Sequence, residues 1–156
     1  LQGENELVER IYDALSQASD PEIRELGRIW TAYNMANTGR LDEAKKLLAE
    51  IGEVDQESNL FAVYCLANGR LALSEKNSIQ ALRFLSRAMV RTTIADSYKP
   101  EIYFLMIQSY MMVENIVPAT RLAKEMAVFY PTNMWRESVT RRYPELEEQE
   151  IEIKAE

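Results

Sequence analysis

Residues 57–90 read ESNLFAVYCLANGRLALSEKNSIQALRFLSRAMV and contain the clearest structural pattern in the chain. Two apolar segments with helical spacing are separated by the polar pair Lys76-Asn77. Small residues stand at Gly69 in the first segment and Ala81 in the second. Apolar residues that recur every three or four positions are typical of amphipathic helices, and small residues let antiparallel helices approach closely. The segment therefore predicts a helical hairpin that crosses at these two positions.

Similar helix signals continue in both directions along the chain. Asp20-Pro21 is a good N-cap followed by a good first helical residue, and Gly39 is suited to end that helix. Ser78 and Thr132 are expected to cap two later helices, and Pro100 to open another. The expected helices cover residues 4–19, 21–39, 41–51, 57–75, 78–89, 100–113, 118–130 and 133–143.

The predicted helices pair into hairpins that repeat. The small residues Ala44, Ala81 and Ala119 stand at the same place in successive hairpins, 37 and 38 residues apart. A fixed period of this size is typical of helical repeat proteins. We expect three repeats, over about residues 25–57, 58–99 and 100–131, between an N-terminal helix at 4–19 and a capping helix at 133–143.

These residues resemble the tetratricopeptide repeat (TPR) family. Tyr103, Tyr110, Ala119 and Pro131 take the family's places in the third repeat, although both spacings exceed the family's period of about 34 residues. The resemblance implies an all-α fold, an α-α superhelix of about three helix-turn-helix repeats with flanking capping helices. It covers a single domain over residues 1–143, which we expect to act as a protein–protein interaction module, scaffold or adaptor.

The resemblance also implies a concave groove lined by the first helix of each repeat. Such a groove, mostly apolar, suits a partner's peptide or amphipathic helix, and the protein's own terminal helix is the other possible occupant. A second hypothesis is that the same surface makes the chain a homodimer or a subunit of a larger assembly. The implied groove residues are Ile29, Trp30, Tyr33, Leu66, Arg70, Leu73, Glu101, Phe104, Gln108 and Met111.

The composition argues against catalysis and against cofactors. The 156 residues include no histidine and one cysteine, and the five glycines are scattered. The chain therefore lacks an imidazole base, a thiolate metal site and a phosphate-binding glycine loop, and Cys65, in an apolar segment, is expected to be buried in the core. We expect no enzyme activity, no catalytic residues, no cofactor and no metal; a helical hydrolase using Glu, Ser or Lys is the weaker alternative.

Charge and hydropathy restrict the partners further. The net charge of −7 disfavours nucleic acid, and no apolar stretch is long enough to span a membrane. Residues 144–156 hold six acids and one base, and we expect this acidic tail to be disordered. Arg136, Arg141 and Arg142 precede it, either as a solvated helix end or as a docking point for the tail or an acidic partner. Because the chain starts at Leu1, we expect an excised or processed piece, and the compartment is open between cytoplasm and periplasm.

Overall fold

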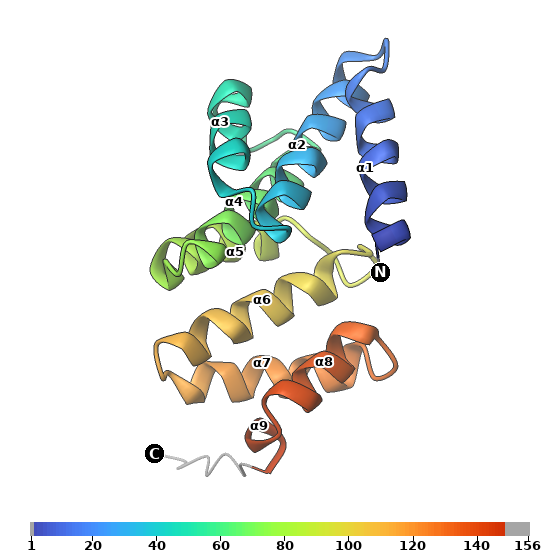
Figure 1. Cartoon of the computed structure of the whole chain (residues 1–156). Coiled ribbons are helices and arrows are strands. Elements are labelled where there is room, and N and C mark those ends of the chain that lie inside the picture. The colour runs from blue at the N-terminus through green and yellow to red at the C-terminus, as the bar shows by residue number, and fades with distance from the viewer. Residues whose placement is uncertain (1, 149–156) are drawn as a thin grey trace. The chain divides into compact units, whose positions relative to one another are not determined.

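The computed structural model describes the backbone of residues 2–148 and the side chains of residues 6–146. Every regular element in this part of the chain is an α-helix, which confirms the all-α prediction (Figure 1). The helices pack into two compact units, Leu1–Thr92 (unit 1) and Thr93–Glu156 (unit 2). The helices are α1 (Gln2–Ser16), α2 (Pro21–Asn37), α3 (Leu41–Ile51), α4 (Phe61–Ser74), α5 (Ser78–Val90), α6 (Lys99–Met112), α7 (Ile116–Phe129), α8 (Met134–Arg142) and α9 (Glu145–Glu148).

Local sequence explains how α2 begins and ends. The Asp20 carboxylate accepts hydrogen bonds from the backbone N–H groups of Glu22 and Ile23, at 2.8 and 3.0 Å, as predicted. An N-cap of this kind satisfies donors that have no partner within the helix. At the other end, Gly39 has a φ of +85°, which is unfavourable for residues with a side chain. The next residue, Arg40, donates its N–H to the Met35 carbonyl at 2.8 Å and closes the helix.

Two other caps differ from the prediction by one residue. The cap of α5 is Asn77 and not Ser78, because the Asn77 side chain accepts from the N–H of Gln80 at 3.1 Å. The cap of α8 is Asn133 and not Thr132, since its side chain accepts from the N–H of Trp135 at 2.9 Å. Asparagine is among the strongest N-cap residues, so adjacent polar residues compete for this position.

Helix α4 begins at Phe61, four residues after the predicted start at Glu57. The preceding residues form turns stabilised by their own side chains. The Asp55 carboxylate accepts from the N–H of Glu57 at 2.7 Å, and the Ser58 hydroxyl oxygen accepts from the N–H of Leu60 at 3.1 Å. Local bonds of this type compete with the helix for backbone groups.

Unit 1 is built around α2, which packs against α1, α3 and α4, while α4 also packs against α5. A Cβ atom at Gly69 would lie 2.7 Å from the side chain of Leu85. A Cβ at Gly27 would lie 2.4 Å from the backbone nitrogen of Ser16. Small residues therefore allow α4 to approach α5 closely, as the sequence predicts. They also allow the close approach of α2 to α1.

The core of unit 1 includes the fully buried side chains of Ile29, Leu66, Leu85 and Cys65. Burial raises the pKa of the Cys65 thiol to about 11, because the charged thiolate is unfavourable away from water. The thiol is therefore protonated at neutral pH. The prediction that Cys65 belongs to the core is confirmed.

In unit 2, α6 packs against α7 and α8, and α7 also packs against α8 and α9. The Tyr103 hydroxyl donates to the Glu125 carboxylate at 3.2 Å, and burial together with this carboxylate raises the pKa of Tyr103 to about 12. Leu146 of α9 is fully buried. The acidic segment is expected from the sequence to be disordered, but it begins with a short helix that packs through this one buried apolar side chain. Residues 149–156 of the segment lie outside the described residues.

The helical hairpins α2–α3, α4–α5 and α6–α7 occur where the three repeats are predicted. In unit 1 the first helices of two successive hairpins, α2 and α4, lie in contact. The single domain over 1–143 stays a prediction, and the chain packs as two compact units that separate between Thr92 and Thr93. This point falls in the non-helical connection between α5 and α6, a usual place for a boundary between compact units.

Candidate functional site

The structure places the predicted groove residues on three first helices. Those on α2 and α4 belong to unit 1, and those on α6 belong to unit 2. Six of the ten have nearly all of their surface buried, so they offer little area to a partner: Ile29, Tyr33, Leu66, Leu73, Glu101 and Phe104. The other four are half-buried, Trp30, Arg70, Gln108 and Met111. Their contact with a partner stays a prediction.

Within unit 1, two hydrogen bonds join α2 to α4 at this surface. The Arg70 guanidinium donates to the Asn37 side-chain oxygen. One turn further along α4, the Ser74 hydroxyl donates to the Ala36 carbonyl at 3.1 Å. The Nε atom of Arg70 is buried and has no hydrogen-bond partner among the described residues. We name the surface formed by Trp30, Tyr33, Asn37 and Arg70 the α2/α4 face.

Trp30 is held by aromatic rings of two helices. It stacks on Tyr12 of α1, with ring centroids 5.9 Å apart and planes 13° apart. It also meets Tyr33 edge-on, with centroids 5.4 Å apart. Both arrangements are favourable for aromatic pairs. The indole is therefore fixed in position while part of its surface remains exposed.

A hollow of about 330 Å³ lies between α1 and α2, at a place that the sequence does not indicate. The hollow results from the register in which α1 packs against α2. The one sign of it in the sequence is that Glu9 and Asp13, four residues apart, lie on the same face of a helix. The hollow is lined by Glu9, Arg10, Tyr12, Asp13, Thr31, Asn34, Met35 and Arg40.

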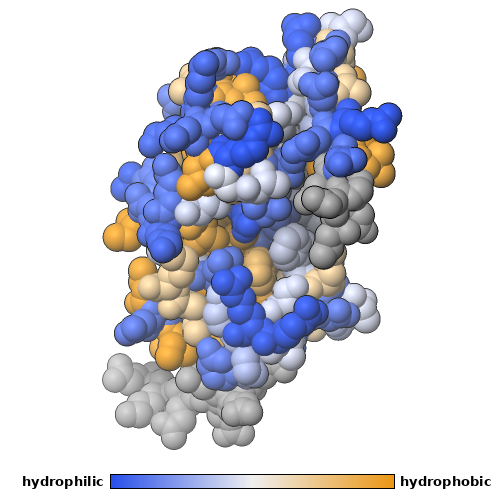
Figure 2. Space-filling model, viewed as in Figure 1, coloured by the Kyte–Doolittle hydropathy of each residue, from blue (hydrophilic) through white to orange (hydrophobic). Residues whose placement is uncertain are grey.

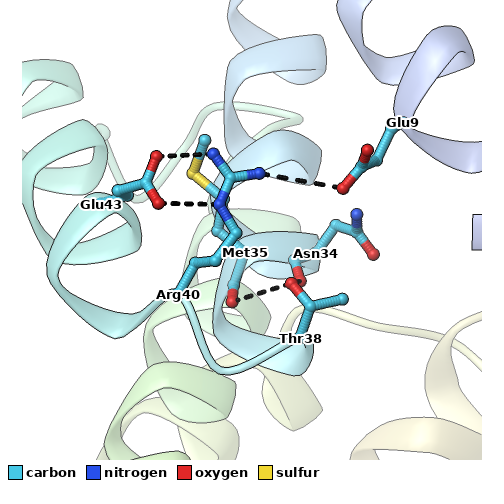
Figure 3. A network of polar contacts seen from close by, with 6 residues as sticks. All are labelled: Glu9, Asn34, Met35, Thr38, Arg40 and Glu43. Atoms are coloured by element: carbon cyan, nitrogen blue, oxygen red, sulfur yellow. Dashed lines mark hydrogen bonds and ion pairs between the residues drawn. The ribbon is translucent and has the colours of Figure 1, made fainter. Parts of the chain in front are cut away.

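Arg40 carries a network of charges beside this hollow (Figure 3). Its guanidinium donates to both carboxylate oxygens of Glu43, at 2.8 and 2.5 Å, and lies 3.8 Å from a carboxylate oxygen of Glu9. The hydrogen bond from Arg40 lowers the pKa of Glu43, and the same bond raises the pKa of Arg40. The positive charge of Arg40 is therefore already balanced by carboxylates of this chain.

Asn34 is the buried polar residue of the hollow, with 8% of its surface exposed. Figure 3 shows its carboxamide pointing from α2 toward α1, near the ion pair of Arg40 with Glu9. The backbone carbonyl of Asn34 accepts from the Thr38 hydroxyl at 2.9 Å. Its side-chain amide makes no hydrogen bond with any described residue.

Unit 2 carries an exposed apolar surface at the turn between α6 and α7. Met112, Val113, Ile116 and Val117 are exposed on both sides of the turn, Val117 by 63%. Figure 2 shows orange, hydrophobic side chains gathered at this end of the hairpin. Glu114, at the centre of the turn, has a φ of +55°. We name these four apolar side chains the α6/α7 tip.

The described residues restrict the chemistry of these surfaces. They contain no group of three or more His, Cys, Asp or Glu side chains that could hold a metal ion. No helix among them has both the length and the apolar character needed to cross a bilayer. The surfaces therefore offer hydrogen bonds, charges and apolar contacts. No family model, no curated protein and no solved structure matches the chain.

Proposed function

We propose that the protein is an interaction module whose α2/α4 face binds a segment of a partner protein. Two observations on neighbouring first helices carry this proposal: the fixed, partly exposed Trp30 of α2, and the hydrogen bond from Arg70 of α4 to Asn37 of α2. Trp, Tyr and Arg are the residues that most often dominate binding energy at protein interfaces. We further propose that the three hairpins form a TPR-like superhelix, an arrangement that the packing of α2 on α4 supports.

The rigidity of the face favours binding. Trp30 lies between Tyr12 and Tyr33, and Arg70 is anchored to Asn37, so these side chains lose little freedom when a partner docks. Trp30 would provide apolar contact area. Arg70 would donate to a carboxylate or a backbone carbonyl of the partner segment. The interaction is binding without chemistry.

The test is selection of peptides from a phage-displayed library on the full chain. Selected peptides are expected to lose about tenfold or more in affinity to Arg70→Ala and Trp30→Ala variants, as is typical of interface anchors. Lys46→Ala, an exposed change on α3, is the matched control and is expected to keep the affinity. Circular dichroism checks that each variant remains helical. Equal binding by the wild type and both face variants would contradict the proposal.

A second candidate function, self-association, is favoured by the α6/α7 tip. Four exposed apolar side chains at one turn form a surface that soluble proteins commonly cover. Light scattering at several concentrations tests whether the chain forms dimers or larger assemblies. A concentration-dependent mass that Val117→Asp abolishes would support this function, and a constant monomer mass would exclude it.

A further inference from the structure

The hollow between α1 and α2 contains a polar group that the proposed interaction face does not use. Asn34 has 8% of its surface exposed and lines the hollow, and its carboxamide makes no hydrogen bond with any described residue. The fully buried polar atoms without a partner among the described residues are Arg70 Nε and Gln108 Oε1, so water in the hollow can reach the Asn34 amide. The amide offers two donors and one acceptor to a ligand. A polar ligand group in the hollow could therefore bond to Asn34 in place of water.

Two opposite charges without ion pairs line the same hollow. Arg10 and Asp13 stand three residues apart on α1. Neither forms an ion pair with any described residue. Arg40, in contrast, is engaged by Glu43 and Glu9. The groups left for a ligand are one cation, one anion and one amide.

The remaining walls and the size of the hollow restrict the ligand further. Tyr12 and Met35 provide apolar surface. The volume of about 330 Å³ falls at the lower end of the range for sites that bind small molecules. A ligand with a single positive charge would leave Arg10 unused, and one with a single negative charge would leave Asp13 unused. A small zwitterion with an uncharged side chain uses both.

We propose that this hollow binds a free α-amino acid with an uncharged side chain. Its carboxylate accepts hydrogen bonds from Arg10, and its ammonium group donates to Asp13. The Asn34 carboxamide completes the site by bonding to one of these two ligand groups, and the ligand's side chain packs against Tyr12 and Met35. Binding joins α1 to α2 without any covalent step. It uses none of the four residues of the α2/α4 face, although Tyr12 also stacks on Trp30 of that face.

The first experiment titrates the ¹⁵N-labelled full chain with L-leucine and follows backbone amide shifts. L-leucine is expected to saturate the amides around residues 10–13 and 31–35 with a Kd of about 1 mM. L-leucinamide lacks the carboxylate and N-acetyl-L-leucine lacks the ammonium group, so each is expected to bind about tenfold more weakly. Absence of saturable shifts up to about 10 mM, or equal binding by either analogue, would overturn the proposal.

The second experiment changes the site. Asn34→Leu removes the amide at similar volume, so the variant is expected to remain folded, which urea denaturation checks. It is nevertheless expected to bind L-leucine about tenfold more weakly, as are Arg10→Gln and Asp13→Asn. Glu6→Gln, on α1 but outside the hollow, is the matched control and is expected to bind normally.

Unchanged binding in Arg10→Gln and Asp13→Asn would overturn the proposal even if Asn34→Leu failed to fold, because both of these residues are exposed and replaceable. The result is separable from the proposed interaction function. Peptides selected on the α2/α4 face are expected to bind these α1 variants as they bind the wild type.

Discussion

Gly69 of α4 lies so close to Leu85 of α5 that a methyl group at Gly69 would come within 2.7 Å of the leucine side chain. Leu85 is fully buried and cannot easily move aside. The contact lies at the crossing of the α4–α5 hairpin, and the same principle applies where Gly27 of α2 meets the backbone of α1. Glycine at these positions is therefore a packing requirement.

Gly69→Ala is expected to destabilise unit 1 by about 1 kcal/mol, because overpacking of about 1–3 kcal/mol exceeds the gain in helix propensity of about 1 kcal/mol. Gly27→Ala is expected to cost more, since its added Cβ would meet backbone atoms. Urea denaturation followed by Trp30 fluorescence measures both. Equal or increased stability of Gly27→Ala would show that α1 packs differently against α2.

The caps identified in the structure can be tested directly. Asn133→Ala is expected to lower the stability of unit 2 by about 1 kcal/mol, because the N–H of Trp135 loses its partner. Thr132→Ala is the matched control and is expected to have little effect, since the structure gives the cap to its neighbour. Urea denaturation followed by Trp135 fluorescence compares the two variants. A larger loss of stability in Thr132→Ala than in Asn133→Ala would show that Thr132 is the N-cap, as the sequence predicts.

The raised pKa of the Cys65 thiol predicts that the stability of the protein depends on pH. The folded thiol keeps its proton up to a pKa of about 11, whereas the unfolded thiol, with a pKa of about 9, loses it earlier. The unfolded state therefore binds fewer protons between these pH values, and the stability falls as the pH rises. The loss amounts to about 2–3 kcal/mol at most.

The comparison of wild type with Cys65→Ala isolates this effect from the tyrosines, which titrate in both proteins. Cys65→Ala is expected to lose stability more gradually between pH 9 and pH 11. The thiol of the folded wild type is also expected to react slowly with a thiol reagent at neutral pH. Rapid labelling without unfolding would contradict the buried position.

The burial of Leu146 predicts that the start of the acidic tail contributes to the stability of unit 2. Leu146→Ala is expected to cost unit 2 about 2–3 kcal/mol, because the side chain is fully buried. Glu145→Gln, an exposed change in the same helix, is the control and is expected to cost little. Urea denaturation followed by Trp135 fluorescence distinguishes them, and an unchanged midpoint in Leu146→Ala would mean that α9 does not pack on α7.

Much of the fold could be predicted because its signals are local. Asp20, Pro21 and Gly39 delimit α2 through their own backbone and side-chain preferences. Local signals fail where neighbours compete, as at Asn77 and Ser78, or where side chains form turns, as before Phe61. Most of the errors therefore concern helix ends, and the exception is the short helix α9, which is not predicted from the sequence.

The candidate sites were less predictable. The resemblance to the TPR family implies that Ile29 and Leu66 line the groove, but it does not reveal that packing buries both side chains completely. The unpartnered amide of Asn34 has no signature in the sequence, because burial and hydrogen bonding depend on which helix lies opposite.

Composition and helical periodicity alone thus establish an all-α chain of paired helices without histidine chemistry, since helix formation and capping depend on residues a few positions apart. The packing of distant helices establishes the rest: the fixed Trp30, the hollow beside Asn34, and the buried Leu146. Those features arise from contacts between residues far apart in the chain, whose free energies depend on the three-dimensional register of the helices.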